Sequence, residues 1–226
     1  MAVPSSIQVK SGTAHNITEW LRGRTMSIYL VRHGKDDEGF RGGWSQRGLI
    51  AEGIEQSKKL GQYLKAHNNL YNIQRVVSSD LSRAVETATE IASELRLPLE
   101  SSNNWREMNN GLIAGMAHEL VEEQYPGLYF STLRMDEEFP GGESPIDFFT
   151  RIQATFKKLC EEQLLNKGEG NILIVTHGGV INIIYHILNG VEWSNKGKAY
   201  PSTYTSLHHI HYDAGKWEIA METLSV

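Results

Sequence analysis

The stretch IYLVRHGKD, residues 28–36, places four apolar residues directly before an arginine, a histidine and a glycine. Short apolar runs of this kind are typical of strands that are buried on both faces of a parallel sheet. In open α/β sheets, binding sites lie beyond the carboxyl ends of the strands. The stretch therefore predicts a buried first strand that delivers Arg32, His33 and Gly34 to a site.

The composition indicates an ordinary globular domain. The chain has 226 residues, of which 40% are hydrophobic and 22% charged, which suits one large domain. Its net charge of −5 argues against nucleic acid or an anionic membrane as the main partner but leaves room for a local basic pocket. The single cysteine, Cys160, excludes an internal disulfide, so we expect a cytoplasmic location. No apolar run approaches the roughly 18 to 20 residues needed to span a bilayer.

The first 25 residues differ from the rest of the chain because they are mostly polar and carry no apolar run typical of a secretion signal. They read either as a loose arm ahead of a start at Met26 or as a partner-binding arm. We therefore expect a polar arm of unknown role at residues 1–25 and one domain at residues 26–226.

Helical and extended patterns alternate along that domain. Helical spacing of apolar residues covers 48–66, 80–95, 144–160 and 180–188, and short strands are expected at 74–78, near Pro98, at 171–176, 205–212 and 217–224. Asp80 and Ser144 are expected to cap helices, and Pro145 suits a first helical position. Residues 107–142 are less regular and are expected to form an excursion over one end of the sheet. The alternation predicts an α/β domain with a mainly parallel sheet.

Three predicted strand ends carry unusual chemistry. The first ends in Arg32 and His33, the second leads into a helix with Arg83 in its first turn, and the strand at 171–176 ends in His177-Gly178-Gly179. If these strands are parallel neighbours, two arginines and two histidines meet in one pocket. The arginine fork and the N–H groups of a helix start both suit a phosphate. Such a pocket would hold an anion whose phosphorus His33 could attack.

Several motifs in order give the chain from about residue 27 to 224 a resemblance to the histidine phosphatase superfamily, which has the phosphoglycerate mutase-like fold. They are LVRHG (30–34), LIAEGIEQSKKLG (49–61), SSDLSRAVETA (78–88), REMNNGLIAG (106–115), PGGES (140–144) and VTHGGVI (175–181). The resemblance implies a three-layer α/β/α sandwich around a mainly parallel sheet with one antiparallel edge strand.

The same resemblance implies roles for five residues. His33 matches the nucleophile that becomes phosphohistidine, and Glu107 matches the general acid. Arg32, Arg83 and His177 match the phosphate-binding residues. We therefore expect residues 26–226 to be the catalytic domain of a metal-independent, acid-type histidine phosphatase. It would need no cofactor and would hydrolyse a small phosphorylated metabolite.

For four other residues, the sequence gives weaker signals of a role in the site. Gly34 and Gly178 would let the backbone approach a ligand. Glu143 of the PGGES motif either orients the pocket or is a plain loop carboxylate. Arg41, with Phe40 and Trp44, either reads a second anionic group or lies in a solvated loop.

The histidines of LHHIH (207–211) resemble a metal cluster at first sight. On a strand, His209 and His211 would share a face while His208 points away. No carboxylate or cysteine lies at a supporting spacing, so we expect a solvated sheet edge there and no metal site.

Two departures from the family pattern bear on the reaction. Lys35-Asp36-Asp37-Glu38 follow the Arg-His-Gly motif, which puts the usual substrate contacts in doubt. Met108 stands where mutases of the family resemble one another in carrying arginine, and the charges of 116–139 are mostly acidic. An acidic cover would repel a bisphosphate, so we expect hydrolysis rather than isomerisation; whether 116–140 forms a lid is left open.

The remaining alternatives are a cofactor-dependent phosphoglycerate or phosphosugar mutase and a non-catalytic phospholigand-binding protein. We expect the leaving group to be partly apolar, with the pocket rimmed by Phe40, Trp44, Met108, Leu112 and Tyr129. The sequence identifies neither the natural substrate nor the oligomeric state, for which a homodimer is one alternative.

Overall fold

The computed structural model of the protein describes residues 26–166, 169–197 and 199–224; the predicted arm at 1–25 lies outside these ranges. The strands are β1 (Ser27–Arg32), β2 (Ile73–Ser79), β3 (Leu99–Ser102), β4 (Asn171–Thr176), β5 (Leu207–Asp213) and β6 (Lys216–Leu224). The α-helices are α2 (Ala51–Ala66), α3 (Asn68–Tyr71), α4 (Ser82–Leu95), α5 (His118–Gln124), α6 (Pro145–Leu165) and α7 (Gly178–Asn189). Two short 3-10 turns, η1 (Asn103–Trp105) and η2 (Gly111–Ile113), lie between β3 and α5.

The six strands form one sheet in the order β3-β2-β4-β1-β5-β6. The first four are parallel to one another, β5 is antiparallel to β1, and β6 is antiparallel to β5. The predicted mainly parallel sheet is confirmed, with the antiparallel strand β5 lying one place inside the edge strand β6.

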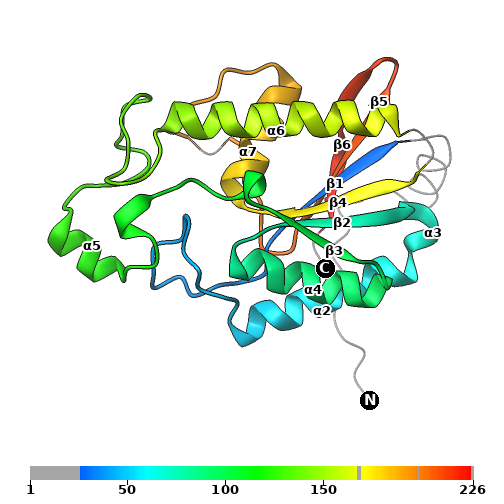
Figure 1. Ribbon diagram of the computed structural model, residues 1–226, viewed down its shortest axis with the longest axis horizontal. Coiled ribbons are helices and arrows are strands. Elements are labelled where there is room, and N and C mark those ends of the chain that lie inside the picture. The colour runs from blue at the N-terminus through cyan, green and yellow to red at the C-terminus, as the bar shows by residue number, and fades with distance from the viewer. Residues whose placement is uncertain (1–25, 167–168, 198, 225–226) are drawn as a thin grey trace.

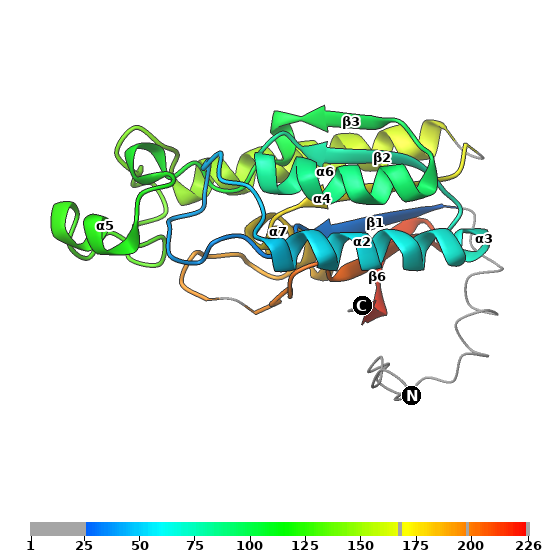
Figure 2. The same cartoon turned by 90° about the horizontal axis from the view of Figure 1, so that it is seen from below.

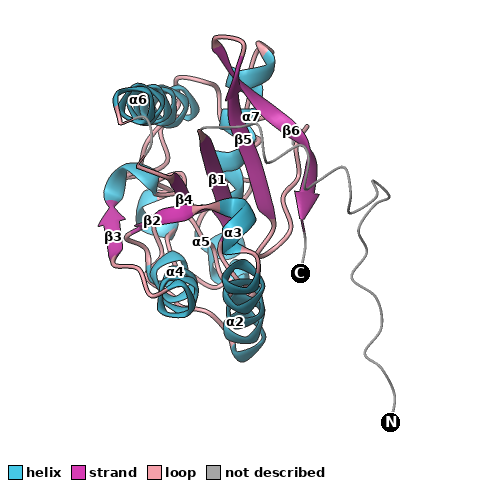
Figure 3. Cartoon of the chain, turned by 90° about the vertical axis from the view of Figure 1, so that its right-hand side faces the viewer, coloured by secondary structure: helices cyan, strands magenta, loops and turns pink. Residues whose placement is uncertain are grey.

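Helices cover both faces of the sheet and give three layers, with α6 and α7 on one side and α2 and α4 on the other (Figures 1 and 3). Strand β1 serves both cores, because alternate side chains point to opposite faces. Ile28 and Leu30 belong to the core under α6 and α7, whereas Tyr29 and Val31 pack with α2 and α4. All four side chains are fully buried, as the apolar run predicted.

The irregular stretch from Glu107 to Gly142 leaves the sheet at one end, where α5 is its only α-helix among the described residues. Figure 2 shows the arrowheads of β1 and β3 pointing toward the end of the molecule where α5 lies. The predicted excursion therefore stands beyond the carboxyl ends of the parallel strands. In the same described part of the chain, the structure contains no helix whose length and apolar character would let it cross a membrane.

The predicted cap at Asp80 is wrong. Helix α4 begins after Leu81, and no side chain caps it. Asp80 instead accepts two hydrogen bonds from Arg106, at 2.6 and 2.7 Å, because the excursion brings that guanidinium next to the strand end. The caps predicted further along are confirmed, since Ser144 accepts the Asp147 amide and Pro145 is the first residue of α6.

The predicted solvated edge at residues 207–211 is also wrong. His208, His209 and His211 expose only 3%, 7% and 4% of their surface, because β5 is flanked by β1 and β6 rather than lying at an edge. The alternation of faces is as predicted: His209 and His211 contact each other at 5.8 Å, while His208 contacts Tyr185 of α7.

Candidate active site

The sheet brings the three strand ends together as predicted. Strand β4 lies between β1 and β2 and is parallel to both, so the residues that follow each strand meet at one end. The His33 amide donates to the Thr176 carbonyl at 3.0 Å, and the rings of His33 and His177 lie 5.1 Å apart. Arg83, from the first turn of α4, donates to His33 Nε2 at 3.3 Å.

The hydrogen bonds of His33 fix which ring nitrogen carries the proton. Nδ1 lies 2.8 Å from the carbonyl oxygen of Gly34, which can only accept. Nε2 faces the Nε–H of Arg83, which can only donate. The proton is therefore on Nδ1, and Nε2 holds a lone pair. That is the form of imidazole that can act as a nucleophile.

Both histidines are neutral at physiological pH. Burial is the main cause that lowers the pKa of His33 well below its ordinary value, and the charges of Arg83 and Arg32 lower it further. Burial likewise lowers the pKa of His177, with Arg83 as the next cause. A buried imidazole beside two guanidinium groups loses more by being charged than one in water, so the ring stays neutral and Nε2 keeps its lone pair, which in this structure accepts the Arg83 N–H.

His177 is held by a serine from the neighbouring strand. Its Nε2 lies 2.9 Å from Ser79 Oγ, and Ser79 Oγ also accepts the Leu81 amide at 3.4 Å. Nδ1 of His177 has no partner in the described part of the chain. In the tautomer that carries the proton on Nδ1, Ser79 donates to Nε2 and Nδ1 is a donor for a bound anion.

Arg83 is almost fully buried, with 2% of its surface exposed. Besides His33, its guanidinium donates to the Ser45 and Gly43 carbonyls at 3.1 and 2.8 Å and lies 3.6 Å from the Asp36 carboxylate. Burial lowers its pKa, and Asp36 opposes that shift. Arg83 and His177 thus lie next to His33, although the residues that line the cavity do not include them.

Arg32 does line that cavity. One of its terminal nitrogens donates to the Ser202 carbonyl at 2.6 Å, and its guanidinium lies over the Tyr204 ring at 4.0 Å. Its Nε is buried without a partner among the described residues, and so is the Ser202 hydroxyl. Two donors beside His33 are therefore unused.

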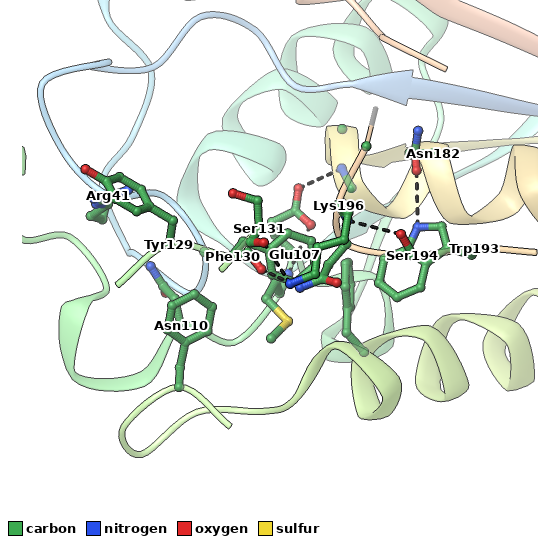
Figure 4. Close-up of a pocket in the computed structure, with 18 of the residues that line it drawn as sticks. Arg41, Glu107, Asn110, Tyr129, Phe130, Ser131, Asn182, Trp193, Ser194 and Lys196 are labelled. Carbon is green, nitrogen blue, oxygen red and sulfur yellow. Dashed lines mark hydrogen bonds between the residues drawn. The ribbon is translucent and has the colours of Figure 1, made fainter. Parts of the chain in front are cut away.

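Glu107 is fixed by two backbone amides on opposite sides of its carboxylate. Oε2 accepts the Gly179 N–H at 2.9 Å and Oε1 accepts the Met108 N–H at 3.0 Å. A Cβ at position 179 would lie 2.3 Å from Oε1, so only glycine allows this contact. The first turn of α7 thereby holds the candidate acid at the cavity wall (Figure 4).

Glu143 does not line the cavity but contacts it indirectly, through Arg151. It accepts two hydrogen bonds from Arg151, at 2.7 and 3.2 Å, and accepts the Asn109 amide. Arg151 in turn donates to the carbonyls of Arg106 and Glu107, both at 3.2 Å. Of the two readings from sequence, the geometry favours the first: Glu143 orients the segment that presents Glu107.

The two glycines singled out from sequence differ in what they do. A Cβ on Gly34 would lie 2.5 Å from the Gly53 carbonyl oxygen, so Gly34 allows α2 to pack against the nucleophile loop. Gly178 lines the cavity, and a Cβ there would meet only ordinary contacts with Ser202 and Arg32.

A cavity of about 700 Å³ opens in front of His33. Of the predicted rim, Met108 and Tyr129 line it, whereas Phe40, Trp44 and Leu112 do not. Phe40 instead stacks under Arg47, Trp44 donates to the Glu107 carbonyl, and Leu112 is 65% exposed.

Charges around the cavity differ from those expected of an acidic cover. None of the acidic side chains of 116–139 lines it; Glu107 is the one lining carboxylate within the described ranges. Arg41 does line it, but its charge is shared with Glu122 at 3.1 Å. Lys196, which the sequence did not single out, also lines the cavity and donates to the Ser131 carbonyl (Figure 4).

One group that could hold a metal ion occurs in the part of the chain that the structure describes: His211, Asp213 and Glu218 of the β5–β6 hairpin. The interpretation that no carboxylate lies at a supporting spacing for the histidines of 207–211 is therefore wrong, because the hairpin brings two carboxylates to His211. This group lies at the opposite end of β1 from Arg32, since His211 pairs with Ser27, and Glu218 also contacts Lys216. It therefore has no part in the chemistry at His33.

Comparisons with known proteins agree with this geometry. The model of the histidine phosphatase superfamily (branch 1) matches residues 28–223. Phosphoglycerate mutase-like protein 4 of Arabidopsis thaliana is 29% identical over 199 residues, covering 85% of this chain and 82% of that protein. A broad-specificity phosphatase of Saccharomyces cerevisiae is 26% identical over 167 residues, covering 70% and 67%.

The fold agrees as well. The crystal structure of the α-ribazole phosphatase from Shigella flexneri superposes with a TM-score of 0.72 at 24% identity, covering 89% of this chain and 96% of that one. The family match extends from the first residues of β1 to the end of β6 and includes each strand end of the site. The chain belongs to the histidine phosphatase superfamily, branch 1.

Proposed function

We propose that the protein is a phosphomonoesterase that works through a phosphohistidine at His33. The observation that carries this proposal is the neutral imidazole, whose Nε2 lone pair stands among guanidinium groups at a cavity that Arg32 and Glu107 also line. A lone pair next to cations, beside unused donors, suits attack on a phosphate monoester.

The first step forms a bond from His33 Nε2 to phosphorus and breaks the bond from phosphorus to the ester oxygen. Glu107, in its protonated form, gives its proton to the departing oxygen, since an alkoxide is a poor leaving group. Arg32, Arg83 and the Nδ1–H of His177 stabilise the charge on the transferring group. The reaction releases the alcohol and leaves phosphohistidine.

The second step returns the enzyme to its starting state. Water attacks phosphorus, the bond to Nε2 breaks, and the Glu107 carboxylate takes the proton that water loses. Inorganic phosphate then leaves. Glu107 acts as general acid in the first step and as general base in the second, while His33 is first the nucleophile and then the leaving group.

A phosphomutase is the second candidate, because relatives named as mutase-like are among the similar proteins and Lys196 adds a cation to the cavity. Two features favour hydrolysis. Met108 lines the cavity without a charge, and the charge of Arg41 is already compensated by Glu122. Few free cations therefore remain to grip a second phosphate.

The test follows 3-phosphoglycerate and 4-nitrophenyl phosphate by phosphorus NMR, with and without 2,3-bisphosphoglycerate. We expect release of inorganic phosphate without a bisphosphate primer. If conversion to 2-phosphoglycerate is faster than release of inorganic phosphate, the protein is a mutase and the proposed phosphatase function is wrong.

The same assay on His33→Ala tests the covalent route. We expect activity to fall by far more than about 100-fold, because the loss of a nucleophile usually has a much larger effect than that. Wild-type protein that binds these esters but releases no phosphate would instead indicate a phospholigand-binding protein.

A further inference from the structure

We propose that the cavity beyond His33 receives the alcohol part of the substrate as a ring-sized, uncharged and largely apolar group, and that Asn195 selects a hydroxyl or N–H donor on it. This inference rests on the proposed phosphatase function, because it concerns the part of the ester that leaves. The size, the lining and the unused polar atoms of the cavity carry it.

The cavity is larger than a small polar alcohol needs. Its volume of about 700 Å³ falls within the range of roughly 300 to 1,000 Å³ usual for small-molecule sites. A cavity of roughly 150 Å³ is enough to hold benzene. After a phosphate is placed beside His33, room remains for a leaving group of two fused rings.

The lining beyond the phosphate site is mostly apolar and comes from two sides. The excursion supplies Met108, Ile113, Leu128, Tyr129, Phe130 and Phe139, and the opposite side supplies Phe148, Trp193 and Tyr200. Figure 4 shows Tyr129 and Phe130 on the side of the excursion and Trp193 across from them. Apolar walls of this kind favour a leaving group that can shed water.

Trp193 offers its ring rather than its N–H to this cavity. Its Nε1 donates to Asn182 Oδ1 at 3.2 Å, so its polar atom is already satisfied. Its ring stacks on Phe149 at 5.5 Å and contacts Phe148 at 6.4 Å. The wall is therefore held in place before any ligand binds, which lowers the cost of ordering a site around a rigid ring.

Asn195 supplies a fixed and unused acceptor. The residue lines the cavity and is only 6% exposed. Its Nδ2 donates to the Phe130 and Leu133 carbonyls, whereas its Oδ1 accepts no hydrogen bond from any described residue. Turning the amide over would set Oδ1 against two carbonyl oxygens, so its orientation is fixed. Oδ1 exposes less than 1 Å², so a ligand reaches it when the side chains around it shift. A buried acceptor left unpaired is costly, and a ligand that donates to it gains that energy.

A second anionic group is not the partner that Asn195 Oδ1 prefers. An amide oxygen cannot donate, so a carboxylate or second phosphate would face it without a hydrogen bond. The ammonium of Lys196 is directed at two backbone carbonyls, those of Ser131 and Leu133. A neutral hydroxyl or ring N–H satisfies Oδ1 with no charge to compensate.

The experiment compares matched esters in which one oxygen on the ring carries either a hydrogen or a methyl group. The probes are 2-naphthyl phosphates carrying a hydroxyl at each of ring positions 5 to 8, each beside its methoxy counterpart, with glycerol 3-phosphate as a polar reference. In binding to His33→Ala, where no ester bond breaks, we expect the naphthyl esters to exceed glycerol 3-phosphate in affinity by about 10- to 100-fold, the scale of burying an aromatic ring. At one position or more, the hydroxyl probe should exceed its methoxy partner in kcat/KM by about 10-fold or more, because only it satisfies the buried acceptor.

Two variants separate recognition from anchoring of the cavity wall. Asn195→Leu removes the acceptor and the contacts to residues 130 and 133, and should abolish the preference for the hydroxyl probe. Lys196→Met removes the other contacts to the same segment, those at residues 131 and 133, but leaves the acceptor. It should slow both probes alike and keep the preference.

Binding to His33→Ala, followed by naphthyl fluorescence, repeats the comparison without turnover. Equal affinities for every hydroxyl and methoxy pair, or a preference that survives in Asn195→Leu, would overturn the proposal even if the enzyme is a phosphatase. If the probes bind with the expected preference but wild-type protein does not hydrolyse them to inorganic phosphate, the proposed function is wrong and the proposed binding site is still supported.

Discussion

Acid should destabilise the protein through His208, a buried histidine that the chemistry does not use. His208 is 3% exposed, and its two ring nitrogens contact the hydroxyls of Tyr185 and Ser206 at 2.7 and 2.8 Å. Burial lowers its pKa from 6.5 to about 4. The folded protein therefore keeps this ring neutral at a pH where the unfolded chain protonates it.

The sign and size of the effect follow from that difference. Between about pH 6.5 and pH 4 the unfolded chain binds more protons at this site, so the free energy of unfolding falls as the pH falls. The loss is about 1.4 kcal/mol per pH unit within this window, which gives about 2 kcal/mol at pH 5 and about 3 kcal/mol at pH 4. Above about pH 6.5 the site contributes no pH dependence.

The assay measures urea unfolding of wild-type protein and His208→Gln at about pH 7.5 and pH 5. Other titrating groups are common to both proteins, so the wild type should lose about 2 kcal/mol more than the variant over this interval. Tyr185→Phe is the control, because it removes a hydrogen bond of His208 but keeps the titrating ring; its pH dependence should follow the wild type. Equal losses in wild type and His208→Gln would refute the reasoning.

Four further predictions concern the site. In single-turnover phosphorylation, Glu107→Gln should slow the reaction of esters with poor leaving groups by about 100-fold or more. It should slow the reaction of 4-nitrophenyl phosphate by less. Equal losses for both kinds of ester would mean that Glu107 only positions the substrate. Gly179→Ala should lower kcat by more than about 10-fold with the fold retained by circular dichroism, because its Cβ would lie 2.3 Å from Glu107 Oε1; near wild-type kcat would show that this contact is dispensable. Arg151→Gln should lower kcat about 10-fold with little change in KM, since Arg151 touches the backbone of the acid and not the cavity, and a rise in KM alone would contradict that role. Activity should survive dialysis against a chelator; loss with recovery on adding zinc or manganese would instead make the site histidines metal ligands.

The sequence predicts the centre of the site well, because that centre consists of strand ends. A buried strand signals its position by its apolar run, and the residue after it must then lie at the sheet edge. That rule brings Arg32, His33 and His177 together on the condition that their strands are parallel neighbours, which the strand order confirms. The start of α6 and the cap at Ser144 were likewise accessible, since both depend on local chemistry, although the helix continues to Leu165, beyond the predicted end at Cys160.

What the sequence could not give depends on contacts between distant segments. Asp80 has the right chemistry for a helix cap, but Arg106, 26 residues away, forms a stronger pair with it. The histidines of β5 read as a solvated edge because the pattern predicts the strand at 217–224 but does not show that β5 also pairs with β1 on its other side.

The positioning residues Ser79, Arg151 and Gly179 and the acceptor Asn195 were missed for the same reason. Of these, only the glycine pair at 178 and 179, directly after a buried strand, carried a signal in the sequence. Their partners come from other elements, so their roles become visible only in three dimensions.

The position of β1 in the sheet has a consequence for synthesis. Both neighbours of β1 come late in the chain: Ile28 pairs with Ile172 of β4 and with Ile210 of β5. Ribosomes add about 5 to 20 residues per second, so roughly 7 to 30 s pass before β4 exists to receive it. During that time the nascent chain carries an apolar strand with both hydrogen-bonding edges open, the kind of segment that chaperones shield from aggregation. Among the described strands, β1 is therefore the first to be synthesised, but it can pair with a neighbour only after β4 has been synthesised.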